Sequence, residues 1–278
     1  MPQKGTDGIM NIHTFVICAY KESPYLEECI RSLRGQTVRS NLIMVTSTPN
    51  AYIKGLAEKY QIPCYVNTGQ GGITQDWNFG YAHADSRFVT IAHQDDVYDR
   101  KYLETALCAL ENSGKPLIFF SDYYEIRDGE KVAANRLLKV KRLMLLPLRI
   151  RALQKSVWVR RRILSLGSPI CCPAVTFAAE NLPSPVFRNH FRACEDWEAW
   201  EMISGRKGEF LYDKRRLMGH RIHAGSETSA IIGDHGRSKE EYEMYCKFWP
   251  KWIAGILCRL YAKGQSSNQL ETASERTK

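Results

Sequence analysis

The sequence lacks any run of about 18 consecutive apolar residues, the length that a membrane-spanning helix requires. It also lacks the apolar stretch of a secretory signal, because its first ten residues are mostly polar and include glycine. We therefore expect a cytoplasmic protein without a membrane-spanning helix.

The sequence has no Cys-x-x-Cys pair, although it contains nine cysteines, an odd number. Cys18 and Cys29 lie within apolar patterns, as buried thiols do. This usage argues against a disulfide framework and a zinc site, and it indicates a reducing compartment. With 278 residues, of which 44% are hydrophobic, the chain can bury a sizeable core, so general disorder is excluded.

Acidic residues are absent from residues 131–179, whereas ten lysines and arginines occur within residues 136–162. Leucines are interleaved with these cations, so the segment offers apolar anchors as well as positive charge. We expect residues 136–162 to bind an anionic membrane surface; the alternative is a helix packed on the body of the protein. Nucleic acid would also be attracted. However, no recognised nucleic-acid motif occurs, so we expect no nucleic-acid partner.

Apolar strand patterns alternate with helical periodicity over the first 121 residues. Such alternation indicates βαβ units and a largely parallel sheet flanked by helices. The expected strands cover 12–19, 42–46, 63–66, 87–91 and 116–121, and the expected helices cover 25–33, 51–60, 74–84 and 102–110.

Further along the chain we expect a strand at 174–177, a helix at 197–203 and a strand at 209–211. Residues 239–260 have apolar residues at helical spacing, and the polar run 265–278 is expected to be disordered. We therefore predict a main domain over 11–225 that includes a basic helical insertion at 131–165. A helical extension would cover 226–264, followed by the tail 265–278.

Asp95 and Asp96 directly follow the expected strand 87–91 and the short connection after it. Adjacent carboxylates at a buried strand end are costly to desolvate, so they normally have a cation or several donors nearby. Strand ends of open α/β sheets are also where ligands bind. Hard oxygen ligands there suit Mg²⁺ or Mn²⁺. The alternative is a turn or cap ahead of the next helix, and the pair alone favours that alternative.

Three other polar features accompany this pair. A polar turn containing Ala19, Tyr20 and Glu22 ends the first strand. Asn78 lies on the helix that follows the glycine-rich turn 69–72. A second acidic pair, Glu195 and Asp196, directly precedes an expected helix, where a favourable interaction with the helix dipole is the alternative explanation.

In this ordered combination, the sequence resembles the family 2 glycosyltransferases, which are inverting enzymes of GT-A fold. The family's opening pattern, Ala-Tyr-Asn-Glu and then Gln-Thr, is similar to residues 19–22 and 36–37. Its Gly-rich turn, Asn-x-Gly and Asp-x-Asp-Asp resemble residues 71–72, 78–80 and 93–96. Its acceptor-side Glu-Asp matches residues 195–196. The resemblance covers roughly residues 11–225.

The resemblance implies a metal-dependent transfer of a sugar from a nucleoside-diphosphate sugar. Asp95 would bind a divalent cation, Mn²⁺ or Mg²⁺, and His223 would approach the same metal or the pyrophosphate. Asp196 would take the proton of the acceptor hydroxyl, with Glu195 as its neighbour. The expected donor-binding residues are Ala19, Tyr20, Glu22, Ser47, Asn78, Asp96 and Arg221.

The sequence departs from the family pattern in two places. The family usually has acidic residues after the second strand, where the base is read, but this chain has Thr46, Ser47 and Thr48. The first acid of Asp-x-Asp is His93. Uridine as the donor base is therefore only an expectation.

The leading hypothesis is an enzyme that extends a glycan or lipid-linked acceptor for cell-surface polysaccharide synthesis, at the inner face of the cell membrane. One rival is a GT-A-like module that has lost turnover and only binds membranes or partners, which the two departures favour. The other rival is a nucleotidyltransferase. That class needs a phosphate loop with basic residues, and the turn 69–72 has no adjacent lysine or arginine.

Overall fold

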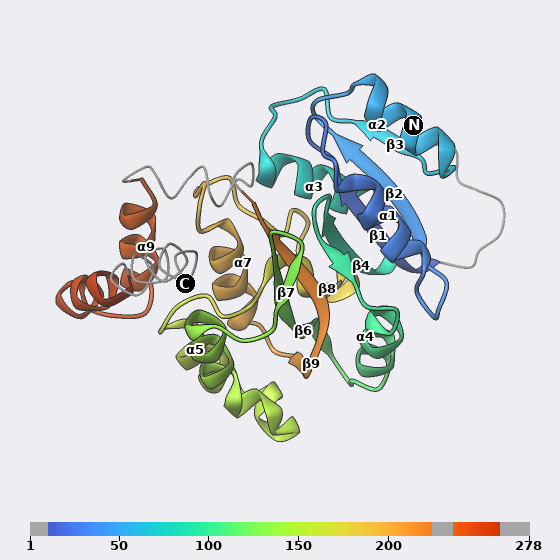
Figure 1. Cartoon of the computed structure of the whole chain (residues 1–278). Coiled ribbons are helices and arrows are strands. Elements are labelled where there is room, and N and C mark those ends of the chain that lie inside the picture. The colour runs from blue at the N-terminus through green and yellow to red at the C-terminus, as the bar shows by residue number, and fades with distance from the viewer. Residues whose placement is uncertain (1–10, 224–235, 262–278) are drawn as a thin grey trace.

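The computed structural model describes residues 11–223 and 236–261. Within these residues, nine strands form one sheet with the order β3-β2-β1-β4-β8-β6-β9-β5, and β7 pairs with β6 (Figure 1). The strands are β1 (Asn11–Cys18), β2 (Asn41–Thr46), β3 (Cys64–Val66), β4 (Ser86–His93), β5 (Val97–Tyr98), β6 (Pro116–Arg127), β7 (Glu130–Val132), β8 (Val175–Ala178) and β9 (Glu209–Ile222).

The first half of the sheet is parallel, as predicted. β1 pairs in parallel with β2 and β4, and β2 pairs in parallel with β3. The connecting helices are α1 (Leu26–Arg34), α2 (Ala51–Lys59) and α3 (Ile73–His83), and α4 (Tyr102–Glu111) follows β4 and β5. Gly80 explains how closely α3 approaches the sheet, because a Cβ atom there would lie 2.3 Å from Val16 Cγ1. The glycine of Asn-x-Gly is thus required by packing.

The second half of the sheet is mixed. β8 pairs antiparallel with β4 and β6, whereas β6 and β9 pair in parallel. Both β6 and β9 are longer than the predicted strands 116–121 and 209–211. The polar residues Ser121 and Asp122 resemble a strand end in the sequence, but both are buried at an irregularity in the β6–β9 pairing. The α/β class is confirmed, with an antiparallel strand β8 at its centre.

Each face of the sheet carries its own hydrophobic core. Alternation along β1 sends Val16 to one core and Phe15 and Ile17 to the other. Side chains of α3, α6 (Val157–Leu164) and α7 (Glu195–Ser204) contribute to the first core. Side chains of α1, α2 and α4 contribute to the second. The two packed faces leave the strand ends as the place for polar chemistry.

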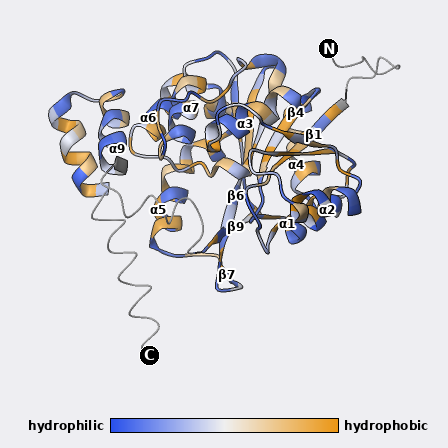
Figure 2. Ribbon diagram, turned by 90° about the horizontal axis from the view of Figure 1, so that it is seen from above, coloured by the Kyte–Doolittle hydropathy of each residue, from blue (hydrophilic) through white to orange (hydrophobic). Residues whose placement is uncertain are grey.

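The basic segment is helical, as predicted, and contains α5 (Arg136–Met144), two short 3-10 turns and α6. Residues 136–166 lie beside α9 (Gly236–Cys246) and the helical residues 251–261 (Figures 1 and 2). We call residues 136–166 and 236–261 together the helical lobe. Its helices join the sheet through Leu145, Leu148 and Ile163, which belong to the first core.

The predicted tail 265–278 lies outside the described residues, and the predicted domain boundaries stay predictions. Within residues 11–223 and 236–261, none of the helices combines the length and the apolar character needed to cross a bilayer.

Candidate active site

A cavity of about 680 Å³ opens at the carboxyl ends of β1, β2 and β4. The crevice beyond such strand ends is the usual ligand site of an open α/β sheet. Seven of the predicted site residues line this cavity: Ala19, Tyr20, Ser47, Asp95, Glu195, Asp196 and His223. The remaining four, Glu22, Asn78, Asp96 and Arg221, are not among its lining residues.

Asp96 lies beneath the cavity and is completely buried. Its Oδ1 accepts hydrogen bonds from the backbone N–H of Arg221 at 2.9 Å and from His220 Nδ1 at 3.0 Å. Burial alone would raise the pKa of Asp96, but the imidazoles of His220 and His93 and the backbone N–H of Arg221 together outweigh burial and lower the pKa below its ordinary value. The same pairing raises the pKa of His220 against the effect of its own burial. Asp96 therefore acts as a buried anchor between β4 and β9.

Asp95 faces the cavity. Its Oδ2 lies 3.0 Å from His223 Nε2, so the structure brings together the two residues predicted to bind metal. Adjacent ligands of an octahedral Mg²⁺ or Mn²⁺ ion at about 2.1 Å would be separated by about 3 Å. This contact is a hydrogen bond, and its length also matches the separation of two neighbouring ligands around one divalent cation.

His93 adds a third polar group beside this pair. One ligand atom from each of His93, Asp95 and Asp96 lies within 4.8 Å of the others. Asp96 Oδ2 and His93 Nε2 are buried without a hydrogen-bond partner. Buried polar atoms of this kind normally have partners, so their presence here fits a site that takes up a cation.

Arg221, a predicted donor-binding residue, is not among the residues that line the cavity. Its Nε donates to the carbonyl of Asp95 at 2.9 Å, and its Nη2 pairs with Glu28 Oε2 at 2.6 Å. Its guanidinium also lies over the ring of Tyr25. Arg221 thus fastens the Asp95 turn to α1. His223, directly after β9, contacts the same two residues as Arg221, because it meets the carboxylate of Asp95 and its ring lies 5.1 Å from that of Tyr25.

Asn78 and Glu22, two other predicted donor-binding residues, are also not among the residues that line the cavity. The side-chain amide of Asn78 donates to the carbonyl of Phe187 at 2.8 Å and accepts from its N–H at 3.1 Å. Both ends of the amide are thus used to hold the chain before α7 against α3. Glu22 is exposed outside the cavity. We therefore do not assign donor binding to either residue.

A buried carboxylate that the sequence did not reveal lies beside the end of β2. Asp76, on α3, lines the cavity and is only 6% exposed. Its Oδ2 accepts from Ser47 Oγ at 2.7 Å, and its Oδ1 accepts from Asn67 Nδ2 at 2.8 Å. A carboxylate beside Ser47 therefore lies where the family pattern would have an acid after the second strand. The signal in the sequence was weak, because an acid in the first turn of a helix is common for its dipole alone.

The second acidic pair stands at the start of α7 and lines the same cavity. Asp196 Oδ1 accepts from the backbone N–H of Trp197 at 2.6 Å. Glu240 of α9 accepts from three consecutive backbone N–H groups, those of Arg192, Ala193 and Cys194, at 2.7 to 3.2 Å. Glu240 thus fixes the turn that aims the acidic pair. Sequence reasoning missed it because its partners lie some 46 residues away along the chain.

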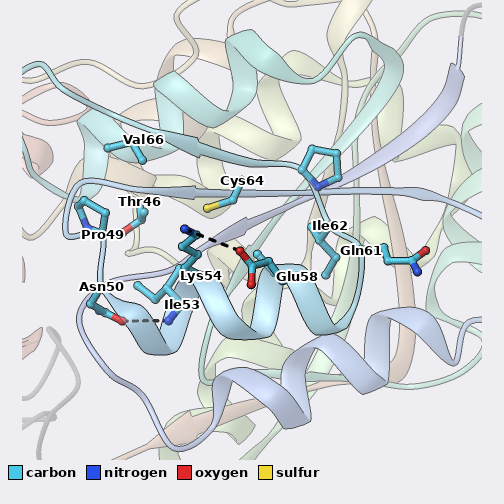
Figure 3. A pocket seen from close by; sticks show the side chains of 12 residues that line it. Thr46, Pro49, Asn50, Ile53, Lys54, Glu58, Gln61, Ile62, Cys64 and Val66 are labelled. Atoms are coloured by element: carbon cyan, nitrogen blue, oxygen red, sulfur yellow. Dashed lines mark hydrogen bonds and ion pairs between the residues drawn. The ribbon is translucent and has the colours of Figure 1, made fainter.

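A second cavity, of about 730 Å³, lies between α2 and β3 (Figure 3). Its only carboxylate, Glu58, lies 3.8 Å from Lys54. It contains neither an acidic pair nor a histidine. The cavity at the strand ends is therefore the candidate active site.

Residues 14–164 match the family model described as glycosyl transferase family 2. This match covers more than half of the chain, and the chain therefore belongs to that family. No curated protein sequence matches the chain.

Among solved structures, the fold is similar to TarS of S. aureus. The TarS 1-349 structure has a TM-score of 0.59 and 12% identity over 89% of this chain and 69% of that one. The structure of TarS 1-349 in complex with UDP-GlcNAc gives 0.59 and 13%, covering 89% and 70%. The longer TarS structure gives 0.56 and 12% over 88% of this chain, but only 42% of that chain. At this identity the likeness establishes the GT-A-type fold.

Proposed function

We propose that this protein is an inverting glycosyltransferase that moves a sugar from a nucleoside-diphosphate sugar to a hydroxyl group of a glycan or lipid-linked acceptor. One observation carries the proposal: Asp95 at the end of β4 and Asp196 at the start of α7 line a single cavity. The reaction needs both functions in one place, because the phosphate leaving group and the acceptor hydroxyl react in the same step.

Asp95 and His223 would hold a divalent cation, Mn²⁺ or Mg²⁺, with His93 beside them. When bound, such an ion stabilises the negative charge that develops on the leaving diphosphate. The protein's own part is to orient the two ligands. Arg221 fixes the backbone of Asp95 through its carbonyl, and Asp96 ties the same turn to β9.

Asp196 is our candidate for the base that accepts the proton of the attacking hydroxyl. A single in-line displacement inverts the anomeric centre and requires one such base. The backbone N–H of Trp197 orients one carboxylate oxygen of Asp196. Glu195 is more deeply buried, at 6% exposure, and we assign it a supporting role in the pair.

Asp76 is our candidate for reading the donor base, which we take to be uracil. An ionised carboxylate accepts hydrogen bonds only, and its two oxygens offer about four acceptor positions. Ser47 and Asn67 occupy two of them, which leaves capacity for the imide N–H of uracil. This assignment explains how the chain can lack an acid after β2 and still present one at the same end of the cavity.

The acceptor side is formed partly by the helical lobe. Lys141 of α5, Glu241 of α9 and Tyr261 line the cavity together with Asp196. An acceptor bound there would contact the lobe, which is consistent with a lipid-linked glycan used at the inner face of the cell membrane. We propose a role in cell-surface polysaccharide synthesis on this basis.

The proposal is tested by screening nucleoside diphosphates and nucleotide sugars for thermal stabilisation, with and without Mn²⁺. We expect Mn²⁺-dependent stabilisation by a uridine diphosphate compound, and release of the diphosphate when an acceptor is added. Binding without any release across a broad acceptor panel would favour the non-catalytic module. Release of inorganic pyrophosphate from a nucleoside triphosphate would identify a nucleotidyltransferase instead.

A further inference from the structure

We propose that the helical lobe binds an anionic membrane through an apolar face on residues 252–260 and α5, and not through the arginines of α6. The inference deepens the membrane setting of the proposed function. Its test uses lipid binding alone, so it can fail or succeed independently of catalysis.

Exposed hydrophobic residues are concentrated in the lobe. Among residues 11–223 and 236–261, thirteen large hydrophobic side chains are more than one third exposed, and nine of them lie in the lobe. Exposed apolar residues that gather in one part of a protein suit an interaction surface, whereas residues scattered singly need no explanation. The nine are Val140, Leu143, Leu146, Ile150, Trp158, Leu166, Trp252, Ile256 and Leu260.

The helix over residues 251–261 has an apolar stripe that is exposed to solvent. Trp252, Ile256 and Leu260 recur every four residues, so they share one helical face, and they are 70%, 50% and 61% exposed. The opposite side packs inward through Ala254 and Leu257. The helix therefore already has its core contacts, and the stripe is additional apolar surface.

α5 repeats this arrangement. Val140 and Leu143 are 48% and 66% exposed, whereas Leu138 on the other side is buried. The two helices belong to one packed unit: a Cβ atom on Gly167 would contact Tyr261 at 3.1 Å and Met144 at 3.7 Å. Figure 2 shows hydrophobic residues on α5 and on the helical turns beside α9.

The charge around these stripes favours an anionic partner. No acidic residue occurs over residues 131–179 or 244–270. Lys139, Lys251 and Arg259 are exposed next to the apolar positions. Apolar side chains flanked by lysine and arginine, with a tryptophan among them, suit the boundary between lipid headgroups and acyl chains. A second copy of this chain fits less well, because a symmetric contact would bring the same cations face to face.

The arginines of α6 are already engaged within the protein. Arg160 is 1% exposed, and its guanidinium donates to the carbonyls of Ser204, Arg206 and Gly208. Arg161 pairs with Glu201 at 2.8 Å, and Arg162 lies over the ring of Trp249. We therefore place the membrane contact on other parts of residues 136–162 and not on these three arginines.

The test is cosedimentation of the full-length protein with vesicles of phosphatidylcholine, alone or with phosphatidylglycerol. We expect binding to the anionic vesicles. The variant Trp252→Ala/Ile256→Ala/Leu260→Ala should weaken binding by on the order of a hundredfold or more at every salt concentration, because apolar burial is lost. Lys139→Gln/Lys251→Gln/Arg259→Gln should lose a similar factor at low salt only, since salt screens charge.

Arg162→Gln is the matched control, because it removes a cation of the same segment that lies against Trp249. We expect its vesicle binding to equal that of the wild type. Equal loss in this control and in the charge variant would overturn the assigned face. Absence of vesicle binding by the wild type would overturn the proposed membrane contact. If the apolar variant then differed from the wild type in oligomeric state, a second copy of the chain would be the partner. Turnover on a water-soluble acceptor, measured in parallel, reports separately on the proposed enzyme.

Discussion

The carboxyl edge of the sheet and the outer surface of the helical lobe differ in how they hold charge. At the edge, charged groups are buried and held by specific partners, as Asp96 is by His220 and the backbone of Arg221. On the lobe, Lys139, Lys251 and Arg259 are exposed, and no acid lies near them in the sequence. A buried charge acts through its fixed position relative to its partners, so a single substitution there should have a large effect on activity. Exposed charges act through their sum, so each should matter little.

The largest effect is expected at Asp196. Asp196→Asn should lower sugar transfer by roughly 10² to 10⁴-fold, the range that a general base contributes, while leaving donor affinity unchanged. Rates of diphosphate release and the Kd of the donor, measured on the same preparation, check this. Glu195→Gln is the neighbouring comparison and should lose less. If Glu195→Gln lost more than Asp196→Asn, we would have chosen the wrong member of the pair.

The next largest effect is expected at Asp95, where both turnover and the response to metal should be lost. Asp95→Asn should reduce turnover by roughly 10² to 10³-fold, as when one stabilising group for the leaving charge is removed. It should also abolish Mn²⁺-dependent thermal stabilisation by a nucleoside diphosphate. Asp85→Asn, an exposed aspartate outside the cavity, serves as the control. Retained Mn²⁺-dependent stabilisation in Asp95→Asn would place the metal elsewhere.

The carboxylate of Asp76 offers a subtler test of geometry. Asp76→Asn should weaken uridine diphosphate binding by roughly ten- to a hundredfold, since a hydrogen bond to a charged group contributes about 1.5 to 3 kcal/mol. The double exchange Ser47→Asp/Asp76→Ser returns the acid to the end of β2 and should restore much of that affinity. Isothermal titration with uridine and adenosine diphosphates measures both. Equal losses of affinity for the two diphosphates would mean that Asp76 holds the loop through Ser47 and Asn67 and does not read the base.

The last effect concerns acid stability and should belong to the sheet, not the lobe. His13, on β1, is buried between Ser40 and Thr90, and burial lowers its pKa to about 3. The unfolded chain takes up this proton near pH 6.5, whereas the folded chain does not, so stability falls as the pH drops below about 6.5. Between pH 7 and pH 5, His13 should therefore account for about 2 kcal/mol of lost unfolding free energy.

Urea denaturation at the two pH values measures this difference. His13→Gln should lose less stability on acidification than the wild type. The control His83→Gln changes an exposed histidine at the end of α3 and tests whether the loss is specific to His13. An unchanged acid response in His13→Gln would show that other groups at the sheet carry it.

The same contrast explains what the sequence could predict. Strand and helix periodicity located β1 to β4 and their helices, because both faces of that sheet must be apolar. The ordered motifs also brought Asp95, Asp196 and His223 to one cavity. A motif does not, however, show which atoms are already used. The amide of Asn78 and the guanidinium of Arg221 belong to the scaffold because Phe187 and Glu28 meet them from distant parts of the chain.

The lobe was harder to predict because the sequence of a basic segment does not show which of its cations are exposed to solvent. Arg142, one of the ten cations within residues 136–162, pairs with the buried Asp122 at 2.6 Å, and this pair also explains why β6 continues past its polar residues. Lys141 turns to Tyr123 and the cavity. Whether such a side chain points inward depends on partners that only the folded chain supplies. The apolar stripe beyond Trp252 was visible as periodicity, but its exposure was not.

The helices that carry the outward apolar stripes also wall the cavity, through Lys141 of α5 and Tyr261 of the last described helix. This shared wall has a consequence for reach. If the stripes rest on a bilayer, Asp95 and Asp196 would stand at a fixed height above the lipid, set by the thickness of a helix pair. An acceptor whose reactive hydroxyl stands at that height would be used, and shorter or longer ones would be passed over. The lobe would then select acceptors by their length as well as attach the protein to the membrane.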